Sequence, residues 1–215
     1  MDTIVIVLIF IIICLVYFLY YTSKKTTNSK TTLYDLNKKY TDISSDDLTN
    51  PKSNRFSYCL WVYVNTWNTN SPKLICNSVD RTDKNNTILS LTLGTTNPSL
   101  DVSVEGNGMK ITDNFPIQKW VYIVISVDSN VSDCYLDGKL VVSKQLSYNK
   151  DIPSAYDITF GNFDAFLTGF EYISKALNPQ EVWNKYMAGN GYAGGKYGVN
   201  LAITKDDAVV SQVSY

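Results

Sequence analysis

Hydrophobic and polar residues alternate through the central part of the chain. Residues 120–127 alternate with a period of two, which predicts a strand with one face against a core. Residues 131–136 lead into Asp137-Gly138, a pair typical of a tight hairpin turn because both turn residues need positive φ. Residues 139–146 complete a three-stranded antiparallel meander, whose apolar face needs a second layer to cover it.

Similar short runs flank the meander and are separated by turn-forming Pro, Gly and Asn residues. The first of them is apolar on both faces, which is typical of a central strand. Many short strands with turn signals between them predict an all-β sandwich or jelly roll. The further predicted strands cover residues 56–64, 73–77, 87–93, 100–105, 109–112, 156–161 and 166–174.

One helix is predicted after the last of these strands. Asn178 is a favourable N-cap residue, Pro179 occupies the first helical position, and Glu181 completes a capping box. We expect this helix to close one end of the sandwich. Its apolar residues, at helical spacing, are Val182, Trp183, Tyr186 and Met187.

The N-terminal segment is strongly apolar. Residues 4–21 carry no charge and would span about 27 Å as a helix, enough to cross the hydrocarbon core of a bilayer. No Lys or Arg precedes this run and no small-residue cleavage motif follows it, which favours a retained transmembrane anchor over residues 1–23. The residues expected to form the anchor are Ile4, Phe10, Leu15, Tyr17, Tyr20 and Tyr21.

The residues after the anchor predict its orientation and the domain boundaries. Lys24 and Lys25 follow the apolar run, so the positive-inside rule predicts a single-pass protein whose body faces the cytosol. The polar residues 24–54 predict a tether, with a short helix around residues 33–39. We expect the sandwich over residues 55–192 and a flexible C-terminal tail over residues 193–215.

Composition narrows the possible chemistry. The net charge of −1 gives no reason to expect a nucleic-acid partner, and the chain has no histidine, the commonest general base and metal ligand. Outside the anchor, Cys59, Cys76 and Cys134 lack the spacing of a zinc site or a disulfide framework. Buried free thiols are the favoured interpretation, although one bridged pair is left open.

Five motifs follow one another in residues 55–192: Phe56–Val62, Trp120-Val121, Tyr135–Leu140, Gly169–Ile173 and Lys175–Val182. In their order and spacing they resemble the concanavalin A-like, or laminin-G-like, jelly-roll family. The resemblance implies a jelly-roll sandwich, a fold that carries lectins, glycanases and adhesion modules.

The resemblance does not extend to catalysis. Glycanases of this family carry an E-x-D-x-x-E type of strand, and this chain has none. Glu105, Glu171 and Glu181 lie far apart in the sequence, whereas glycoside hydrolysis needs a pair of neighbouring carboxylates. We therefore expect that the protein is not an enzyme.

Two kinds of binding site remain possible. Calcium sites at the loop rims of this fold use Asp, Asn and backbone oxygens, and Asn162 with Asp164, or Asp80 with Asp83, are the candidates. Such loop residues more often form turns, so we expect no cofactor. The candidate contacts for a protein partner or a glycan are the aromatic residues Trp67, Phe163, Tyr192 and Tyr197.

The layout of an N-terminal anchor followed by one such domain resembles virion proteins of large DNA viruses with an internal membrane. It implies a structural protein in the virion inner membrane, whose jelly roll docks on a protein shell and links membrane to capsid. Its expected partners are membrane lipid and capsid or scaffold proteins. The alternative is a membrane-anchored, lectin-like module that binds glycans for adhesion.

Overall fold

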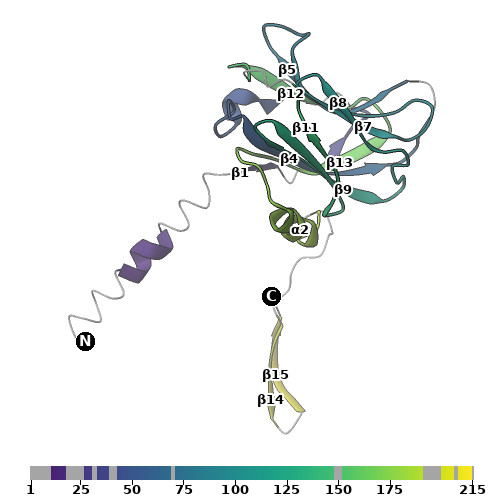
Figure 1. Cartoon of the computed structure of the whole chain (residues 1–215). Coiled ribbons are helices and arrows are strands. Elements are labelled where there is room, and N and C mark those ends of the chain that lie inside the picture. Colours follow the sequence, from purple (N-terminus) through teal and green to yellow (C-terminus); the bar gives the residue numbers. More distant parts are fainter. Residues whose placement is uncertain are drawn as a thin grey trace.

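The computed structural model describes residues 11–17, 27–30, 33–38, 43–68, 71–147, 152–190, 200–205 and 208–214. Two antiparallel sheets, here sheet A and sheet B, face each other, and a helix near the C-terminal end of the domain packs on the outside (Figure 1). The all-β sandwich predicted from the alternating pattern is therefore confirmed.

Sheet A contains the predicted meander. It follows the order β1-β13-β4-β9-β10-β11, and β2 also pairs with β13. Asp137 and Gly138 have φ values of 47° and 78°, so the tight turn between β10 and β11 is confirmed. The strands are β1 (Thr27–Lys30), β2 (Tyr34–Asp35), β4 (Arg55–Val64), β9 (Trp120–Asp128), β10 (Val131–Leu136), β11 (Lys139–Gln145) and β13 (Ala165–Ile173).

Sheet B follows the order β3-β12-β5-β6-β7-β8. Its strands alternate as predicted, with Leu89, Leu91 and Leu93 buried against sheet A while Ser90 and Thr92 point outward. Its strands are β3 (Ile43–Ser44), β5 (Lys73–Asp80), β6 (Thr87–Leu93), β7 (Leu100–Val104), β8 (Asn107–Thr112) and β12 (Tyr156–Phe160).

Sheet A separates two cores. One set of alternating β4 and β9 residues, including Leu60 and Ile123, packs against sheet B in the main core. The opposite set packs against helix α2 (Pro179–Met187) and the segment before it. This second core consists of Cys59, Trp61, Tyr122, Val124, Tyr135, Ile173, Leu177 and Val182, with Trp120 and Tyr186 beside it.

The position of α2 corrects the prediction that it closes one end of the sandwich. It covers the outer face of sheet A instead, because that face is apolar and would otherwise be exposed (Figure 1). Ser126 fixes the approach to the helix, since its Oγ accepts a hydrogen bond from the Leu177 amide at 2.9 Å. The capping box is confirmed: Asn178 and Glu181 each accept a hydrogen bond from the other's backbone amide.

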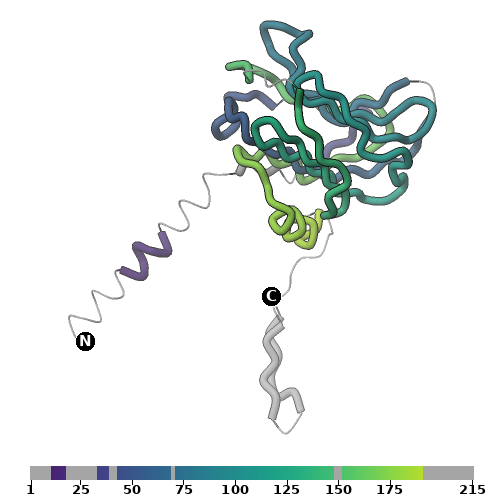
Figure 2. The backbone as a smooth tube through the Cα atoms, in the orientation of Figure 1, coloured from purple at the N-terminus to yellow at the C-terminus, as the bar shows by residue number. Residues whose placement is uncertain are grey.

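The predicted tether is wrong for the described residues 33–38 and 43–54, which belong to the sandwich. Leu36 is fully buried in the main core, together with Ile43 and Leu48. The expected helix around residues 33–39 is replaced by β2, and the Leu36 amide donates to the Ala165 carbonyl at 2.8 Å. Figure 2 shows the backbone of residues 43–54 lying against the folded domain.

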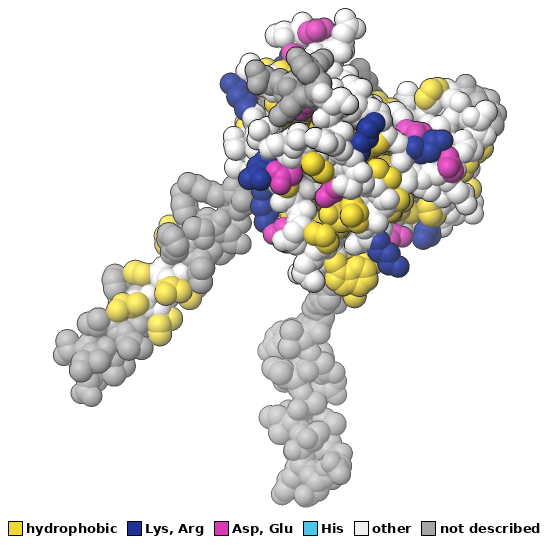
Figure 3. Space-filling view, viewed as in Figure 1, with side chains coloured by type: hydrophobic (Ala, Val, Ile, Leu, Met, Phe, Trp, Pro, Cys, Tyr) yellow, Lys and Arg dark blue, Asp and Glu magenta, His cyan; other side chains and the backbone are white. Residues whose placement is uncertain are grey.

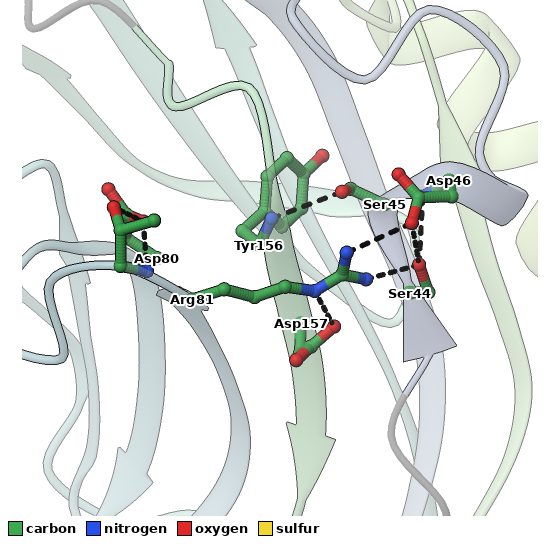
Figure 4. A network of polar contacts seen from close by, with 8 residues as sticks. Ser44, Ser45, Asp46, Asp80, Arg81, Tyr156 and Asp157 are labelled. Atoms are coloured by element: carbon green, nitrogen blue, oxygen red, sulfur yellow. Dashed lines mark hydrogen bonds and ion pairs between the residues drawn. The ribbon is translucent and has the colours of Figure 1, made fainter.

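Polar contacts hold this N-terminal segment on sheet B. The Arg81 guanidinium contacts Asp157 at 2.7 Å, Asp46 at 2.9 Å and the Ser44 hydroxyl (Figure 4). The Tyr156 amide donates to Ser45 Oγ at 3.1 Å. Side-chain contacts of this kind let a polar segment of low strand propensity pack on the sheet.

The three cysteines of the domain are buried free thiols, as favoured from the sequence. Burial raises the pKa of Cys59 and of Cys134 to about 12, and it raises the pKa of Cys76 as well. These thiols are therefore protonated at neutral pH and unreactive in the folded domain.

Outside the domain, the structure describes short stretches of both termini. Residues 11–17 are helical with exposed side chains, among them Leu15 and Tyr17. Within the described residues, no helix has the length and apolar character needed to cross a membrane. In the predicted tail, β14 (Asn200–Lys205) pairs with β15 (Ala208–Ser214). The anchor and orientation residues outside the described part are Ile4, Phe10, Tyr20, Tyr21, Lys24 and Lys25.

Candidate ligand-binding site

The loops that follow β4, β6, β8 and β12 meet at one end of the sandwich, which we call the loop end. Backbone hydrogen bonds join them: the Gln118 amide donates to the Val64 carbonyl at 2.8 Å, and the Phe115 amide donates to the Pro98 carbonyl at 2.7 Å. The loop end is therefore an ordered surface built on both sheets, a common location for binding residues.

Asp164 joins three parts of the chain at the loop end. Its carboxylate accepts hydrogen bonds from Thr66 Oγ1 at 2.7 Å, Asn65 Nδ2 at 2.9 Å and Asn37 Nδ2 at 3.2 Å. Calcium needs several oxygen ligands converging on one point, whereas Asp164 is surrounded by donors. Within the described residues, neither Asp164 nor Asp80 with Asp83 belongs to a group of three His, Cys, Asp or Glu side chains that could hold a metal ion.

The hydrogen bonds to Asp164 give stability a pH dependence. Donation from Asn65, and then from Thr66, lowers the pKa of Asp164 below its usual 3.8. A lowered pKa adds stability above the unfolded-state value, and this contribution is lost as the pH falls through the folded-state value. In thermal denaturation, Asp164→Asn should lower the Tm more at pH 7 than at pH 3. Equal losses at both values would contradict the role of this carboxylate.

The predicted aromatic contacts have different environments. Phe163 is 8 % exposed and packs in the main core, so its prediction as a surface contact is wrong. Trp67 is half-buried, with its Nε1 donating to the Gly94 carbonyl at 3.2 Å and its ring facing Lys73 Nζ at 5.4 Å. Tyr192 and Tyr197 lie outside the described residues.

A surface hollow of about 510 Å³ lies between α2, the loop after β8 and the turn between β10 and β11. Figure 3 shows hydrophobic side chains gathered over α2, with Lys and Arg side chains beside them. Trp183 is 39 % exposed at this hollow, which we call the Trp183 hollow. Its other aromatic and polar lining residues are Tyr186, Thr112, Asn114, Asp137 and Lys139.

The two aromatic rings of the hollow are held by their neighbours. Tyr186 stacks on Trp61 of the second core at 5.7 Å between ring centroids, and Trp183 lies 5.5 Å from Tyr186. Gly138 touches both rings: a Cβ atom there would lie 2.8 Å from Trp183 Cε3 and 3.1 Å from Tyr186 Cδ1. Trp183 is therefore a preorganised surface ring with little rotamer entropy left to lose on binding.

Sequence reasoning missed Trp183 because it assigned that residue to the buried face of the helix. Val182 and Tyr186 are four residues apart and lie above one another, so they define the centre of the apolar stripe. Trp183 lies one position further round the helix, at the edge of that stripe. Partial exposure of Trp183 could have been predicted from the large size of its ring and from its position at the edge of the stripe.

The carboxylate of Asp137, which lines the hollow, forms a hydrogen bond and an ion pair within the domain. Asp137 Oδ1 accepts a hydrogen bond from the Tyr122 amide at 2.9 Å, and Oδ2 lies 3.5 Å from Lys119 Nζ. These contacts hold the turn on β9. Asp137 therefore shapes the wall of the hollow.

A second hollow, of about 310 Å³, lies on the outer face of sheet B. Its lining includes three small hydroxyl side chains, and register places Ser90 beside Ser103 and Thr92 beside Asp101. No aromatic ring lines it among the described residues. The Trp183 hollow is the better candidate because it is larger and two aromatic rings line it.

Comparison with protein-family models decides the family. Residues 36–183 match the model described as the concanavalin A-like lectin/glucanases superfamily. The chain belongs to this superfamily. The match begins at Leu36, in agreement with the burial of that residue in the sandwich. A comparison with curated protein sequences found no match.

Solved structures show the same fold at low sequence identity. The chain is similar to Trypanosoma rangeli sialidase, with a TM-score of 0.53 and 12 % identity over 62 % of this chain and 22 % of that one. It is also similar to the receptor binding domain of botulinum neurotoxin type G, with a TM-score of 0.51 and 16 % identity over 76 % of this chain and 46 % of that one. The chain therefore corresponds to less than half of each of these structures.

A third similar structure is that of botulinum neurotoxin type C, whose cell entry is dependent upon interaction with two ganglioside molecules. Its TM-score is 0.54, with 15 % identity over 75 % of this chain and 46 % of that one. At these identities the likeness concerns the fold.

Proposed function

We propose that this domain is a non-catalytic saccharide-binding module and that the Trp183 hollow is its binding site. The observation that carries the proposal is a fixed, half-exposed Trp183 ring on the wall of a hollow whose other side chains include Asn114, Asp137 and Lys139. Membership in a superfamily of lectins and glucanases supports it.

The chemistry of the hollow suits a sugar ring. One face of a pyranose carries C–H groups that pack on an aromatic ring, while its hydroxyl groups need donors and acceptors around the edge. Thr112 and Asn114 offer both, and Lys139 offers donors. An apolar platform with a few polar groups is the usual composition of a small-molecule site.

The same hollow lacks the groups needed for hydrolysis. Glycosidases place two carboxyl groups roughly 5 to 10 Å apart across the scissile bond. Asp137 is the one carboxylate among the described residues that line the hollow, and its oxygens contact Tyr122 and Lys119. Binding without cleavage is therefore the activity that this arrangement supports.

The first test is binding to a panel of immobilised glycans, with Trp183→Ala compared with the unmodified chain. Loss of the stacking surface should reduce affinity about tenfold or more, since ring packing contributes about 1.5 kcal/mol and 1.4 kcal/mol is a factor of ten. Trp67→Ala is the matched control, because Trp67 lies at the loop end but outside the hollow. Equal losses in the two variants would contradict the assignment of the site.

We also propose the function expected from the sequence, in which a membrane-anchored chain links a membrane to a protein shell. The apolar residues 4–21 support it, and β1 forms the edge of sheet A beside β13. Residues 22–26 would then be the only spacer, at most about 17 Å long, so the domain would lie close to the bilayer.

Protease treatment of inside-out membrane vesicles tests this orientation. The domain should be cleaved, because the cytosolic face of such vesicles is exposed to the protease. Protection there would contradict this orientation.

A further inference from the structure

We infer that the saccharide bound in the Trp183 hollow is acidic and that Lys139 is the partner of its carboxylate. This inference rests on the proposed function and adds the class of ligand. It comes from the charges around the hollow, where Asp113, Asp137 and Glu171 lie in ion pairs and the Lys139 side chain lies in none of those found among the described residues.

Three acidic groups around the hollow lie in ion pairs, whereas Asp133 of β10 lies in none of those found among the described residues. At the turn between β10 and β11, Asp137 lies 3.5 Å from Lys119. In the loop after β8, Asp113 lies 2.8 Å from Lys110. Under α2, Glu171 lies 2.6 Å from Lys185. None of these carboxylates is left to repel an acidic ligand.

Lys139 is the remaining cation. It lines the hollow, its side chain is exposed, and no ion pair to it is found among the described residues. Its backbone is fixed, since β11 starts at Lys139 and register pairs it with Leu136. Lys139 thus extends from a fixed backbone position in the same lining as Trp183.

This arrangement matches a sugar with a carboxylate substituent. The ring would pack on Trp183, and the carboxylate would accept a charge-assisted hydrogen bond from Lys139 Nζ. A neutral sugar would keep the ring contact and lack the ion pair. Because Lys139 is exposed, the expected preference is modest and decreases with added salt.

The test uses acidic oligosaccharides and their methyl esters, which have the same ring and hydroxyl groups without the charge. The panel contains oligosaccharides of glucuronic, galacturonic and sialic acid, and isothermal titration measures each affinity at about 20 mM and about 500 mM salt. We expect an acid to bind about three- to fivefold tighter than its ester at low salt, with the difference largely lost at high salt.

Lys139→Gln should bring the affinity for the acid down to that for its ester. Lys84→Gln removes a lysine from the exposed loop between β5 and β6, at the other end of the sandwich, and should retain the preference. Binding of acid and ester with equal affinity would overturn the inference and leave the proposed function standing. Binding of neither would overturn both.

Discussion

Replacing Gly138 by alanine is expected to lower the free energy of unfolding by about 2–5 kcal/mol and to displace α2. Two costs add up. Gly138 has φ 78°, a left-handed conformation that costs an L-residue about 1–2 kcal/mol. The new Cβ would also lie 2.8 Å from Trp183 Cε3, and overpacking of this kind costs about 1–3 kcal/mol. Urea denaturation measures the sum.

Two other glycines separate these costs. Gly106 also has positive φ, 81°, but a Cβ there would meet nothing within 4 Å, so Gly106→Ala should show the backbone cost alone. Gly108 has neither positive φ nor a close neighbour, so Gly108→Ala should be nearly neutral. If Gly138→Ala cost no more than Gly106→Ala, the turn would not support Trp183 as described.

Replacing Trp61 by alanine is expected to cost about 3–5 kcal/mol, as for other large aromatic side chains removed from a core. Trp61 is buried between Tyr122, at 4.9 Å, and Tyr186, at 5.7 Å between ring centroids. Its loss would leave a cavity directly under α2. Chemical denaturation measures the cost, and hydrogen exchange of the α2 amides shows whether the helix opens independently.

Trp61→Phe is the matched variant, because it keeps an aromatic ring between the two tyrosines. It should retain much of the stability and the protection of α2. Full protection of the α2 amides in Trp61→Ala would contradict the view that the second core holds the helix. In that case the capping box at Asn178 and the ion pair of Lys185 with Glu171 would have to suffice.

The alternating pattern predicted the strands well because each sheet has one face against the main core. The predicted strands over residues 87–93 and 131–136 coincide with β6 and β10. The second core could also have been inferred. Apolar residues on both faces of residues 56–64 and 120–127 indicate two covered faces, and the predicted amphipathic helix was the available cover.

Other features depend on tertiary contacts that no local pattern encodes. Residues 33–54 look like a tether by composition, yet Leu36 is buried because it meets β13, well over a hundred residues further along the chain. Phe163 lies in a turn-like stretch but points into the main core. The Trp183 hollow arises where α2 meets the β10–β11 turn, and only the fold brings Gly138 and Trp183 together.

The central claim is that a saccharide rests on the Trp183 ring. The chain has four tryptophans, so a nitrogen–proton correlation spectrum contains four indole signals that substitution can assign. Titration with a glycan selected from the panel should shift the indole signal of Trp183 and leave that of Trp67 in place. A spectrum in which Trp183 is unmoved at saturation, or in which Trp67 shifts instead, would contradict the account.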